Sequence, residues 1–183
     1  MQRRKLTKKF FNRRALVVAR DILGKIIVRR LNGKTVSVMI IEVEAYDGPS
    51  DRASHAHVGK TKRNEIMFGE AGRWYVYFVY GMHWMLNIVT SKKGYPAAVL
   101  IRAGVVTRHG KEIPINGPAK LTKFLKIDKK FNGLPAISKT GLWLEDSKSL
   151  MPSYRITRGK RIGVEYAGAW AKKPYNFRMT KSE

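Results

Sequence analysis

The 183-residue sequence contains no cysteine, and it is also short of acidic side chains. Without cysteine there are no disulfide bonds and no cysteine-ligated zinc, which fits an intracellular protein. No apolar run is long enough to span a bilayer, and the first residues, MQRRKLTKKFF, lack the apolar core of a signal peptide. We therefore expect no membrane association and a location in the cytoplasm and nucleoid, or in the nucleus of a eukaryote.

The shortage of acid leaves a large positive charge. Only 13 aspartates and glutamates accompany 37 lysines and arginines, for a formal net charge of +24. Such an excess indicates a polyanionic partner, and nucleic acid is the first candidate because neutralised phosphates release counterions. Composition alone leaves two alternatives open: an anionic membrane surface, for which no basic amphipathic helix stands out, and a generally basic proteome.

Internal repeats and low-complexity linkers are absent as well, and the basic residues are spread over the whole length. With 44% hydrophobic and 10% aromatic residues, the chain can bury a substantial core. We expect one domain over residues 1–183, acting as a monomer. A helix is predicted at residues 15–23, with Asn12 as its N-cap, and another at residues 116–127, with Pro118 in its first turn.

Strands account for most of the remaining pattern. They are predicted at residues 25–31, 34–46, 74–80, 84–90, 95–106, 141–146, 154–159 and 161–168. The Asn32-Gly33 pair suits a type I′ turn between the first two strands, and Gly81 separates a second hairpin. The predicted fold is α+β: a single compact domain with a mixed, largely antiparallel β-sheet, flanking helices and a protruding β-hairpin.

Two glutamates end the apolar strand at residues 34–46. Without a bulge, alternation places six side chains on one face: Val36, Val38, Ile40, Glu42, Glu44 and Tyr46. A buried carboxylate is unfavourable unless it is paired, hydrogen-bonded or used, and burial makes it a stronger base. Pairing with lysine or arginine is the ordinary role of a glutamate in a basic protein. The alternative is a reactive pocket.

The loop after this strand favours the pocket, because it carries His55 and His57 close to Glu44 and Tyr46. A metal site built from these histidines and glutamates fits no recognised ligand spacing, so we expect no metal and no cofactor. The set instead combines a carboxylate, an aromatic ring and an imidazole near the end of a strand, which is typical of a pocket.

The segment WYVYFVY, at residues 74–80, predicts an aromatic strand with Tyr75 and Tyr77 on one face. Aromatic strands usually form core, but Tyr77 is also able to stack on a nucleobase inside the fold. Tyr80 and Met82 fall where the hairpin turns. Exposed apolar side chains at such a tip are able to wedge between stacked base pairs.

Seven segments together make the chain resemble the methylpurine-DNA glycosylase family, also called alkyladenine or 3-methyladenine DNA glycosylases. They are ARDILGK, EVEAYDGPSDRASHA, TKRNEIMF, YVYFVYGMHWMLN, VLIRAG, NGPAKL and RIGVEYAGAWAKKP. They occur in the family's order and extend from about Leu6 to Pro174. The resemblance implies a monofunctional base excision repair enzyme. It would flip a damaged purine out of double-stranded DNA and hydrolyse the N-glycosidic bond, leaving an abasic site.

The resemblance also implies roles for individual residues. Glu44 would activate the water, Arg102 and the backbone carbonyl near Ile162 would hold that water, and Glu42 would be a structural partner. Base contacts are implied for Tyr46, His55, Tyr77 and Asn87, the last at the pocket floor. DNA contacts are implied for Tyr80, which fills the gap in the duplex, for Met82 beside it, and for Arg63, Asn64 and Lys120 at phosphates. Simple solvation is an equal alternative for the last three.

The expected chemistry is consistent with these roles. Loss of the base passes through an oxocarbenium-like sugar, which a carboxylate stabilises while taking the proton of water. An N-alkylated purine is cationic and leaves without protonation, whereas hypoxanthine and etheno-adenine, which the sequence leaves open as substrates, are neutral. The motifs offer no lysine as a Schiff-base nucleophile, so we expect hydrolysis without lyase activity.

Two other functions compete with the glycosylase. A non-catalytic basic nucleic-acid-binding protein, including one for RNA, would share the charge and the aromatic residues, but it has no use for a buried Glu44 near an anionic ligand. A hydrolase of nucleosides or small N-glycosides would use the carboxylate, but it needs neither the basic surface nor Tyr80 and Met82 at a hairpin tip.

Overall fold

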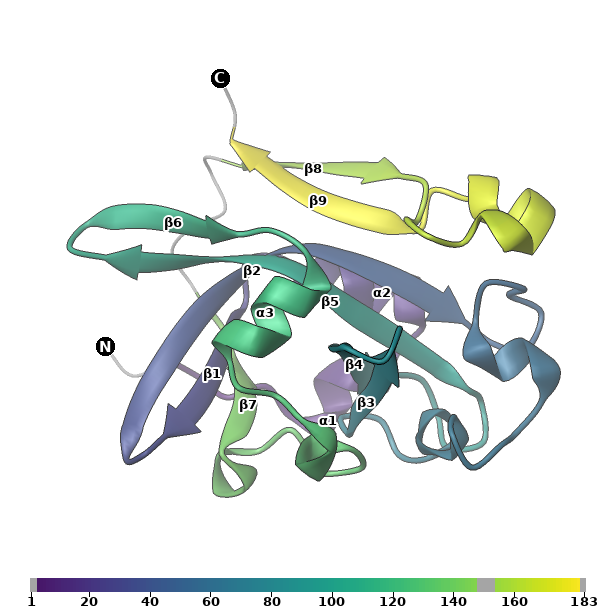
Figure 1. Ribbon diagram of the computed structural model, residues 1–183, viewed down its shortest axis with the longest axis horizontal. Helices are drawn as coiled ribbons and strands as arrows, with labels where there is room; N and C mark the ends of the chain where they lie inside the picture. Colours follow the sequence, from purple (N-terminus) through teal and green to yellow (C-terminus); the bar gives the residue numbers. More distant parts are fainter. Residues whose placement is uncertain (1–2, 148–153, 182–183) are drawn as a thin grey trace.

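A nine-stranded β-sheet dominates the computed structural model, which describes residues 3–147 and 154–181 (Figure 1). The strands are β1 (Ile26–Leu31), β2 (Lys34–Asp47), β3 (Trp74–Val79), β4 (His83–Val89), β5 (Ala97–Arg108), β6 (Lys111–Ile115), β7 (Leu142–Glu145), β8 (Tyr154–Gly159) and β9 (Asn176–Lys181). The main path is β3-β4-β5-β2-β1-β7, with β6 paired to β5 and β9 paired to both β2 and β8. Every pairing between these strands is antiparallel, so the expected single α+β domain with a largely antiparallel sheet is confirmed.

Short helices flank the sheet. They are the α-helices α1 (Lys8–Phe11), α2 (Ala15–Asp21) and α3 (Pro118–Phe124), and the 3₁₀ segments η1 (His55–Val58), η2 (Glu65–Phe68), η3 (Lys129–Phe131), η4 (Ser138–Thr140) and η5 (Glu165–Lys172). Helix α2 buries its apolar stripe against β2 and β5, and α3 packs on β4 and β5. The N-cap of α2 is Arg14, so the prediction of Asn12 was wrong. Among the described residues, no helix is long and apolar enough to cross a bilayer.

Turn chemistry explains the hairpins that the sequence predicted. Asn32 and Gly33 both have positive φ, 49° and 77°, as a type I′ turn requires. Between β3 and β4, Tyr80 and Gly81 also have positive φ, 52° and 65°, and the Met82 amide donates to the Val79 carbonyl at 3.1 Å. This second hairpin is confirmed as an element, whereas its protrusion from the body stays a prediction.

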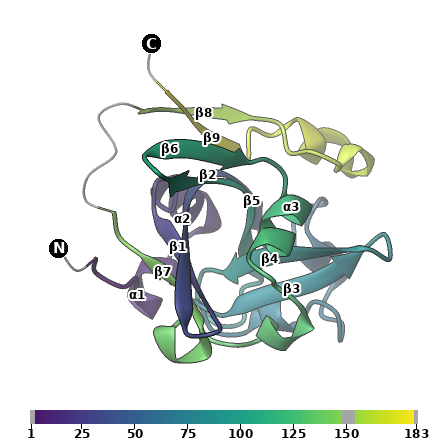
Figure 2. The same cartoon turned by 60° about the vertical axis from the view of Figure 1, so that its left-hand side comes forward.

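The last part of the chain differs most from the sequence prediction. Residues 161–168 do not form a strand, because the segment turns at Gly163 and then enters η5, which is interrupted at Gly168. Strands β6 and β9 were not predicted. Strand β9 pairs with β8 along its length and with β2 at Glu42–Glu44. The connection between β8 and β9 contains η5, which packs near the end of β2 where the site lies (Figures 1 and 2).

A bulge in β2 changes the face on which its glutamates lie. The register with β5 shifts between Ile40 and Val43, so the alternation of side chains is reversed beyond it. Val38 and Ile40 before the bulge and Val43 after it belong to the same buried core. The placement of Glu44 on the face of these apolar residues was predicted only for a strand without a bulge, and that condition is not met. The carboxylates of Glu42 and Glu44 lie on the opposite face of the sheet, which borders a cavity and not the core.

Candidate active site

A cavity of about 530 Å³ lies on this second face of the sheet. It is large enough for one planar heterocycle with its sugar. Side chains from β2, η1, β3, β4, β5 and the segment after β8 converge on it, and they include Tyr46, His55, Tyr77, Asn87, Arg102 and Ile162. The structure thus brings together the residues for which base contact or water holding was predicted, although they are spread over more than 100 positions of the chain.

Glu44 is completely buried behind the wall of this cavity. Its Oε1 atom accepts from the backbone N–H of Ile162 at 2.8 Å and from Asn176 Nδ2 at 3.1 Å. Its Oε2 atom accepts from the Tyr46 hydroxyl at 2.9 Å, and Arg102 Nη1 lies 3.4 Å away. Three hydrogen bonds and one ion pair thus surround the carboxylate, which explains how its burial is tolerated.

Glu44 itself does not line the cavity, but three of its partners, Tyr46, Arg102 and Ile162, do. The carboxylate is one side chain removed from the open space. Any water that it activates must therefore replace one of these donors. Arg102 makes the longest of the four contacts, and the Tyr46 hydroxyl belongs to a side chain that borders the cavity.

Glu42 anchors the donors that surround Glu44. Its Oε1 atom accepts from Arg102 Nε at 3.1 Å and from Asn176 Nδ2 at 2.8 Å, and Arg178 Nη2 lies 3.2 Å away. Two acids and two arginines therefore share one network with a formal charge of zero. The expectation that Glu42 is a structural partner of the site agrees with these contacts.

His55 lies between two tyrosines on the cavity wall. Its Nδ1 atom is 2.9 Å from the Tyr75 hydroxyl, and its ring centroid is 4.6 Å from that of Tyr77. Burial, with a smaller effect from the charge of Arg63, lowers the pKa of His55 to about 4. The imidazole is therefore neutral at physiological pH, and it is a poor source of a proton.

Burial also keeps the tyrosines of the site protonated. It raises the pKa of Tyr46 well above its usual value, with further increases from the nearby Glu44 carboxylate. It raises the pKa of Tyr75 and of Tyr77 in the same way. The cavity thus presents neutral phenol rings, whose electron-rich faces favour flat and cationic ligands.

Asn87 lies at the inner end of the cavity, 2% exposed, on the strand that pairs with β3. Its Nδ2 atom donates to the Tyr75 carbonyl at 3.1 Å, which fixes the orientation of the amide. The side chain lines the cavity, as expected for a residue at the pocket floor. Its predicted contact with a base remains a prediction.

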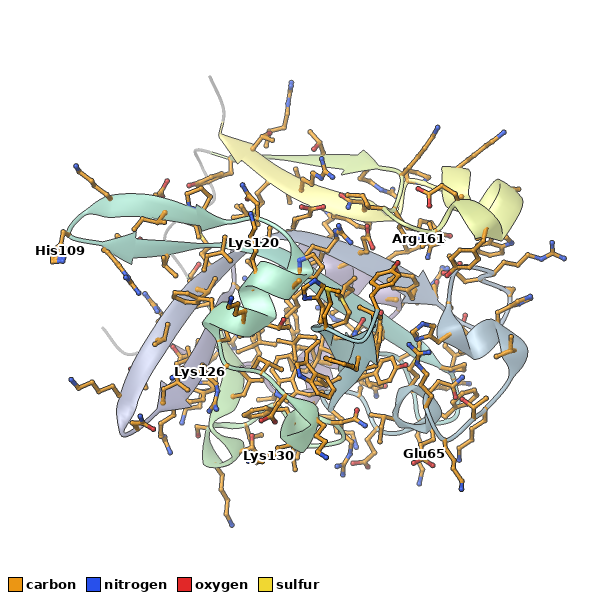
Figure 3. The ribbon with its side chains drawn as sticks, viewed as in Figure 1. Glu65, His109, Lys120, Lys126, Lys130 and Arg161 are labelled. Atoms are coloured by element: carbon orange, nitrogen blue, oxygen red, sulfur yellow. The ribbon has the colours of Figure 1, made fainter. Side chains whose placement is uncertain are left out.

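A buried ion pair holds the walls of the site together. The guanidinium of Arg161 makes a bidentate pair with Asp51, at 2.5 and 2.8 Å, and both side chains are fully buried. Arg161 also donates to the Ala45 carbonyl at 2.9 Å, and its guanidinium lies 4.8 Å from the centre of the Tyr46 ring. Figure 3 shows Arg161 where the segment after β8 meets β2. It therefore ties that segment and the loop of His55 to β2.

The predicted phosphate contacts divide into two groups. Asn64 is 1% exposed and donates to the His55 and Gly59 carbonyls at 2.8 Å, so its interpretation as a phosphate ligand was wrong. Arg63 lies at the cavity, 5.5 Å from the Tyr77 ring centre, and it forms no ion pair within the described part of the chain. Lys120 is exposed on α3 (Figure 3), and its contact with DNA stays a prediction, as does that of Arg63.

The hairpin tip is exposed, as the sequence indicated. Tyr80 is 85% exposed and lines the cavity mouth, and Met82 is 65% exposed and lies outside it. A bulky residue with positive φ is uncommon, and such backbone conformations concentrate at functional sites. The tip therefore holds Tyr80 in solvent beside the cavity, and its predicted insertion into a duplex stays a prediction.

Sequence reasoning missed Asn176, Asp51, Arg161 and Tyr75 as parts of the site. Asp51 and Arg161 lie in two of the motifs that resemble the family. An acid and an arginine in two such motifs were a signal for an ion pair between them. Asn176 lay beyond the last motif, and nothing in the local pattern indicated β9. Over the ranges 3–147 and 154–181, no group of three or more histidine, aspartate or glutamate side chains could hold a metal ion.

A buried carboxylate beside an aromatic cavity, on a protein with a charge of +24, is typical of enzymes that act on a base taken out of a nucleic acid. The chain belongs to the methylpurine-DNA glycosylase family, whose sequence profile matches residues 9–183. Membership of this family implies a DNA substrate.

Three relatives carry the name "Putative 3-methyladenine DNA glycosylase". The protein from Methanocella arvoryzae is 43% identical over 94% of this chain and 90% of its own length. One from an Anaeromyxobacter species is 41% identical over 96% of this chain and 89% of its own length. A third, from Desulfitobacterium hafniense, is 38% identical over 98% of this chain and 97% of its own length. The similarity therefore covers nearly the whole chain.

Proposed function

We propose that the protein is a monofunctional DNA glycosylase that acts as a monomer on double-stranded DNA. It flips a damaged purine nucleotide of the 3-methyladenine type into the cavity and hydrolyses the N-glycosidic bond, leaving an abasic site. The observation that carries this proposal is the position of Glu44, fully buried and hydrogen-bonded at the wall of an aromatic cavity. A protein that only binds DNA gains nothing from an acid there.

In the proposed mechanism Glu44 has two roles. Its negative charge stabilises the oxocarbenium-like sugar, and it accepts the proton of the attacking water. Because three hydrogen bonds and the ion pair with Arg102 already surround the carboxylate, binding of the water has to displace one of these partners. We infer that the Oε2 atom is released, since its partners Tyr46 and Arg102 are the side chains that border the cavity. The Ile162 carbonyl would complete the cage around the water.

The damaged base would bind between the rings of Tyr46 and Tyr77, with His55 at its edge and Asn87 at the floor. Stacking on aromatic side chains contributes about 1–3 kcal/mol per base. An N-alkylated adenine gains further from its positive charge over neutral, electron-rich phenol rings. The base is cationic while it is attached to the sugar. It takes the electron pair of the glycosidic bond and leaves as a neutral purine, so this substrate needs no general acid.

Hydrolysis, rather than lyase chemistry, is favoured by the composition of the cavity wall. None of the described residues that line the cavity is a lysine, so no amine is placed to attack the sugar. Neutral lesions such as hypoxanthine and etheno-adenine would depart more slowly. With a pKa of about 4, His55 is not a protonated acid at neutral pH. We include these lesions as slower substrates.

The test is base release from three duplexes that carry a single 3-methyladenine, hypoxanthine or etheno-adenine. We expect an intact strand with an abasic site as the product, and fastest release of the alkylated adenine. A strand break formed together with base loss, and trapped covalently by borohydride, would overturn the assignment as a simple hydrolase. Tight duplex binding without any release would instead favour a non-catalytic DNA-binding protein.

A further inference from the structure

Asn176 contacts both glutamates of the site from the neighbouring strand. It lies directly opposite Glu44 in the pairing of β2 with β9, and it is 1% exposed. Its single amide nitrogen donates to Glu42 Oε1 at 2.8 Å and to Glu44 Oε1 at 3.1 Å. Both N–H groups are therefore used, one on each carboxylate.

Arg178 fixes the orientation of this amide. The two residues lie on the same face of β9, and Arg178 Nε donates to Asn176 Oδ1 at 3.1 Å. Amide oxygen and nitrogen are often assigned only by such networks. If the amide were reversed, its oxygen would face two carboxylate oxygens, and its NH₂ group would face the guanidinium. The surrounding charges thus leave one arrangement.

Asn176 and Arg102 bridge the same two acids from different sides. Arg102 borders the cavity and reaches Oε2 of Glu44, whereas Asn176 does not border it and reaches Oε1. Asn176 and the Ile162 N–H therefore both hold the Oε1 atom of Glu44, which has no side-chain partner that borders the cavity. The other oxygen remains available for the water.

We propose that Asn176 is a positioning residue that holds the Glu44 carboxylate by its Oε1 atom and so presents the Oε2 atom to the cavity. An amide donates hydrogen bonds to the carboxylate without adding a second positive charge to that of Arg102, so the negative charge stays available to the developing sugar cation. The charge balance of Glu42, Glu44, Arg102 and Arg178 stays at zero. This inference rests on the proposed function of Glu44.

The test compares Asn176→Asp with the wild-type protein in single-turnover base release across a range of pH. The substitution keeps the shape of the side chain but replaces the donor by a third carboxylate, which disfavours ionisation of Glu44. We expect the acidic limb of the pH–rate profile to move to higher pH by about one unit or more, with a rate that recovers toward wild type as pH rises.

Two further variants support the interpretation. Asn176→Ala removes one hydrogen bond to a charged group without adding a charge. We expect release to slow about 10- to 100-fold near neutral pH, with unchanged duplex binding, even if the aspartate variant does not fold. Thr180→Ala is the matched control, because Thr180 is on the same face of β9 but bonds only to the Arg155 carbonyl. It should behave as wild type.

The result that would overturn the inference is a pH–rate profile for Asn176→Asp that runs parallel to that of the wild type, since a purely structural residue lowers the rate equally at every pH. If the wild-type protein releases no base, the proposed function fails, and the inference is judged separately. NMR titration of ¹³C-labelled glutamate side chains would then show whether Glu44 titrates at higher pH in Asn176→Asp than in wild type. Equal titration would reject the positioning role.

Discussion

At the scale of single residues, Tyr46 brings two different groups to the site. Its hydroxyl donates to Glu44 Oε2, and its ring lines the cavity with the guanidinium of Arg161 on one side. The two groups have opposite consequences for the proposed reaction. In that proposal the ring would stack on the base, whereas the hydroxyl occupies a lone pair of Glu44 that the attacking water would need.

Variants of Tyr46 separate these contributions. Tyr46→Phe keeps the ring, and we expect single-turnover release to stay within about tenfold of wild type. Tyr46→Ala also removes the stacking surface, and we expect a loss of about 10- to 100-fold beyond the phenylalanine variant. Single-turnover kinetics on one alkylated duplex measure both. Equal losses in the two variants would show that the hydroxyl, rather than the ring, is required.

His55 leads to a prediction about stability. The pKa of His55 is lowered to about 4 in the folded protein, from 6.5 in the unfolded chain. Between pH 6.5 and pH 4 the unfolded chain therefore binds a proton that the folded protein does not bind. The contribution of neutral His55 to the free energy of unfolding is therefore fully present above pH 6.5, and it is lost as pH falls toward 4. Between pH 7 and pH 5 the loss amounts to at most about 2 kcal/mol.

Urea unfolding of wild type and His55→Gln at several pH values measures this effect. Other groups titrate in both proteins, so the difference between the two proteins isolates His55. We expect the wild type to lose more unfolding free energy than the variant as pH falls from 7 to 5. The same slope in both proteins would mean that the folded protein accepts the proton without penalty.

At the scale of elements, the bulge in β2 determines the face of the sheet on which the Glu44 carboxylate lies. Without it, Glu44 would face the core beneath α2, together with Val38 and Ile40. Beyond the bulge, the edge of β2 that pairs with β1 up to Met39 pairs with β9 from Glu42 onward. The bulge and the change of partner therefore build the site together.

Next to the bulge, Gly104 of β5 allows the backbones of β5 and β2 to lie close together. A Cβ atom there would meet the Val38 side chain and would lie 2.8 Å from the Met39 carbonyl oxygen. We expect Gly104→Ala to lower the free energy of unfolding by about 1–3 kcal/mol, the usual penalty of overpacking. Gly159→Ala in β8 is the control, because that Cβ would have no neighbour within 4 Å. Denaturant titration compares the two variants, and equal stability would show that the strands simply shift apart.

The sequence allowed most elements to be predicted, because their signals are local. Asn32-Gly33 identified its turn, and alternation placed Tyr75 and Tyr77 on one face of β3, which the structure confirms. The bulge in β2 and the pairing of Asn176 with Glu44 depend on contacts between segments that are far apart. Local periodicity does not carry that information. The candidate site was therefore predicted in its residue types and motifs, but not in the network that holds Glu44.

At the scale of the whole molecule, the charge of +24 determines how binding responds to salt. Each phosphate that the protein neutralises releases counterions, so affinity for a duplex falls as salt rises. If six to ten phosphates are contacted, the affinity drops by about 10³- to 10⁵-fold between 50 and 200 mM salt. Fluorescence anisotropy with an undamaged duplex measures the slope. Binding that hardly changes with salt would contradict a phosphate-dominated interface.

The proposed role of Glu44 as the base is tested most directly by single-turnover release of one alkylated adenine from a duplex. The experiment compares wild type with Glu44→Gln and measures duplex binding in parallel. The amide keeps the size of the side chain but cannot take the proton of water. We predict that release falls by about 10²- to 10⁴-fold while binding is retained. Equal release by the two proteins would show that another group activates the water.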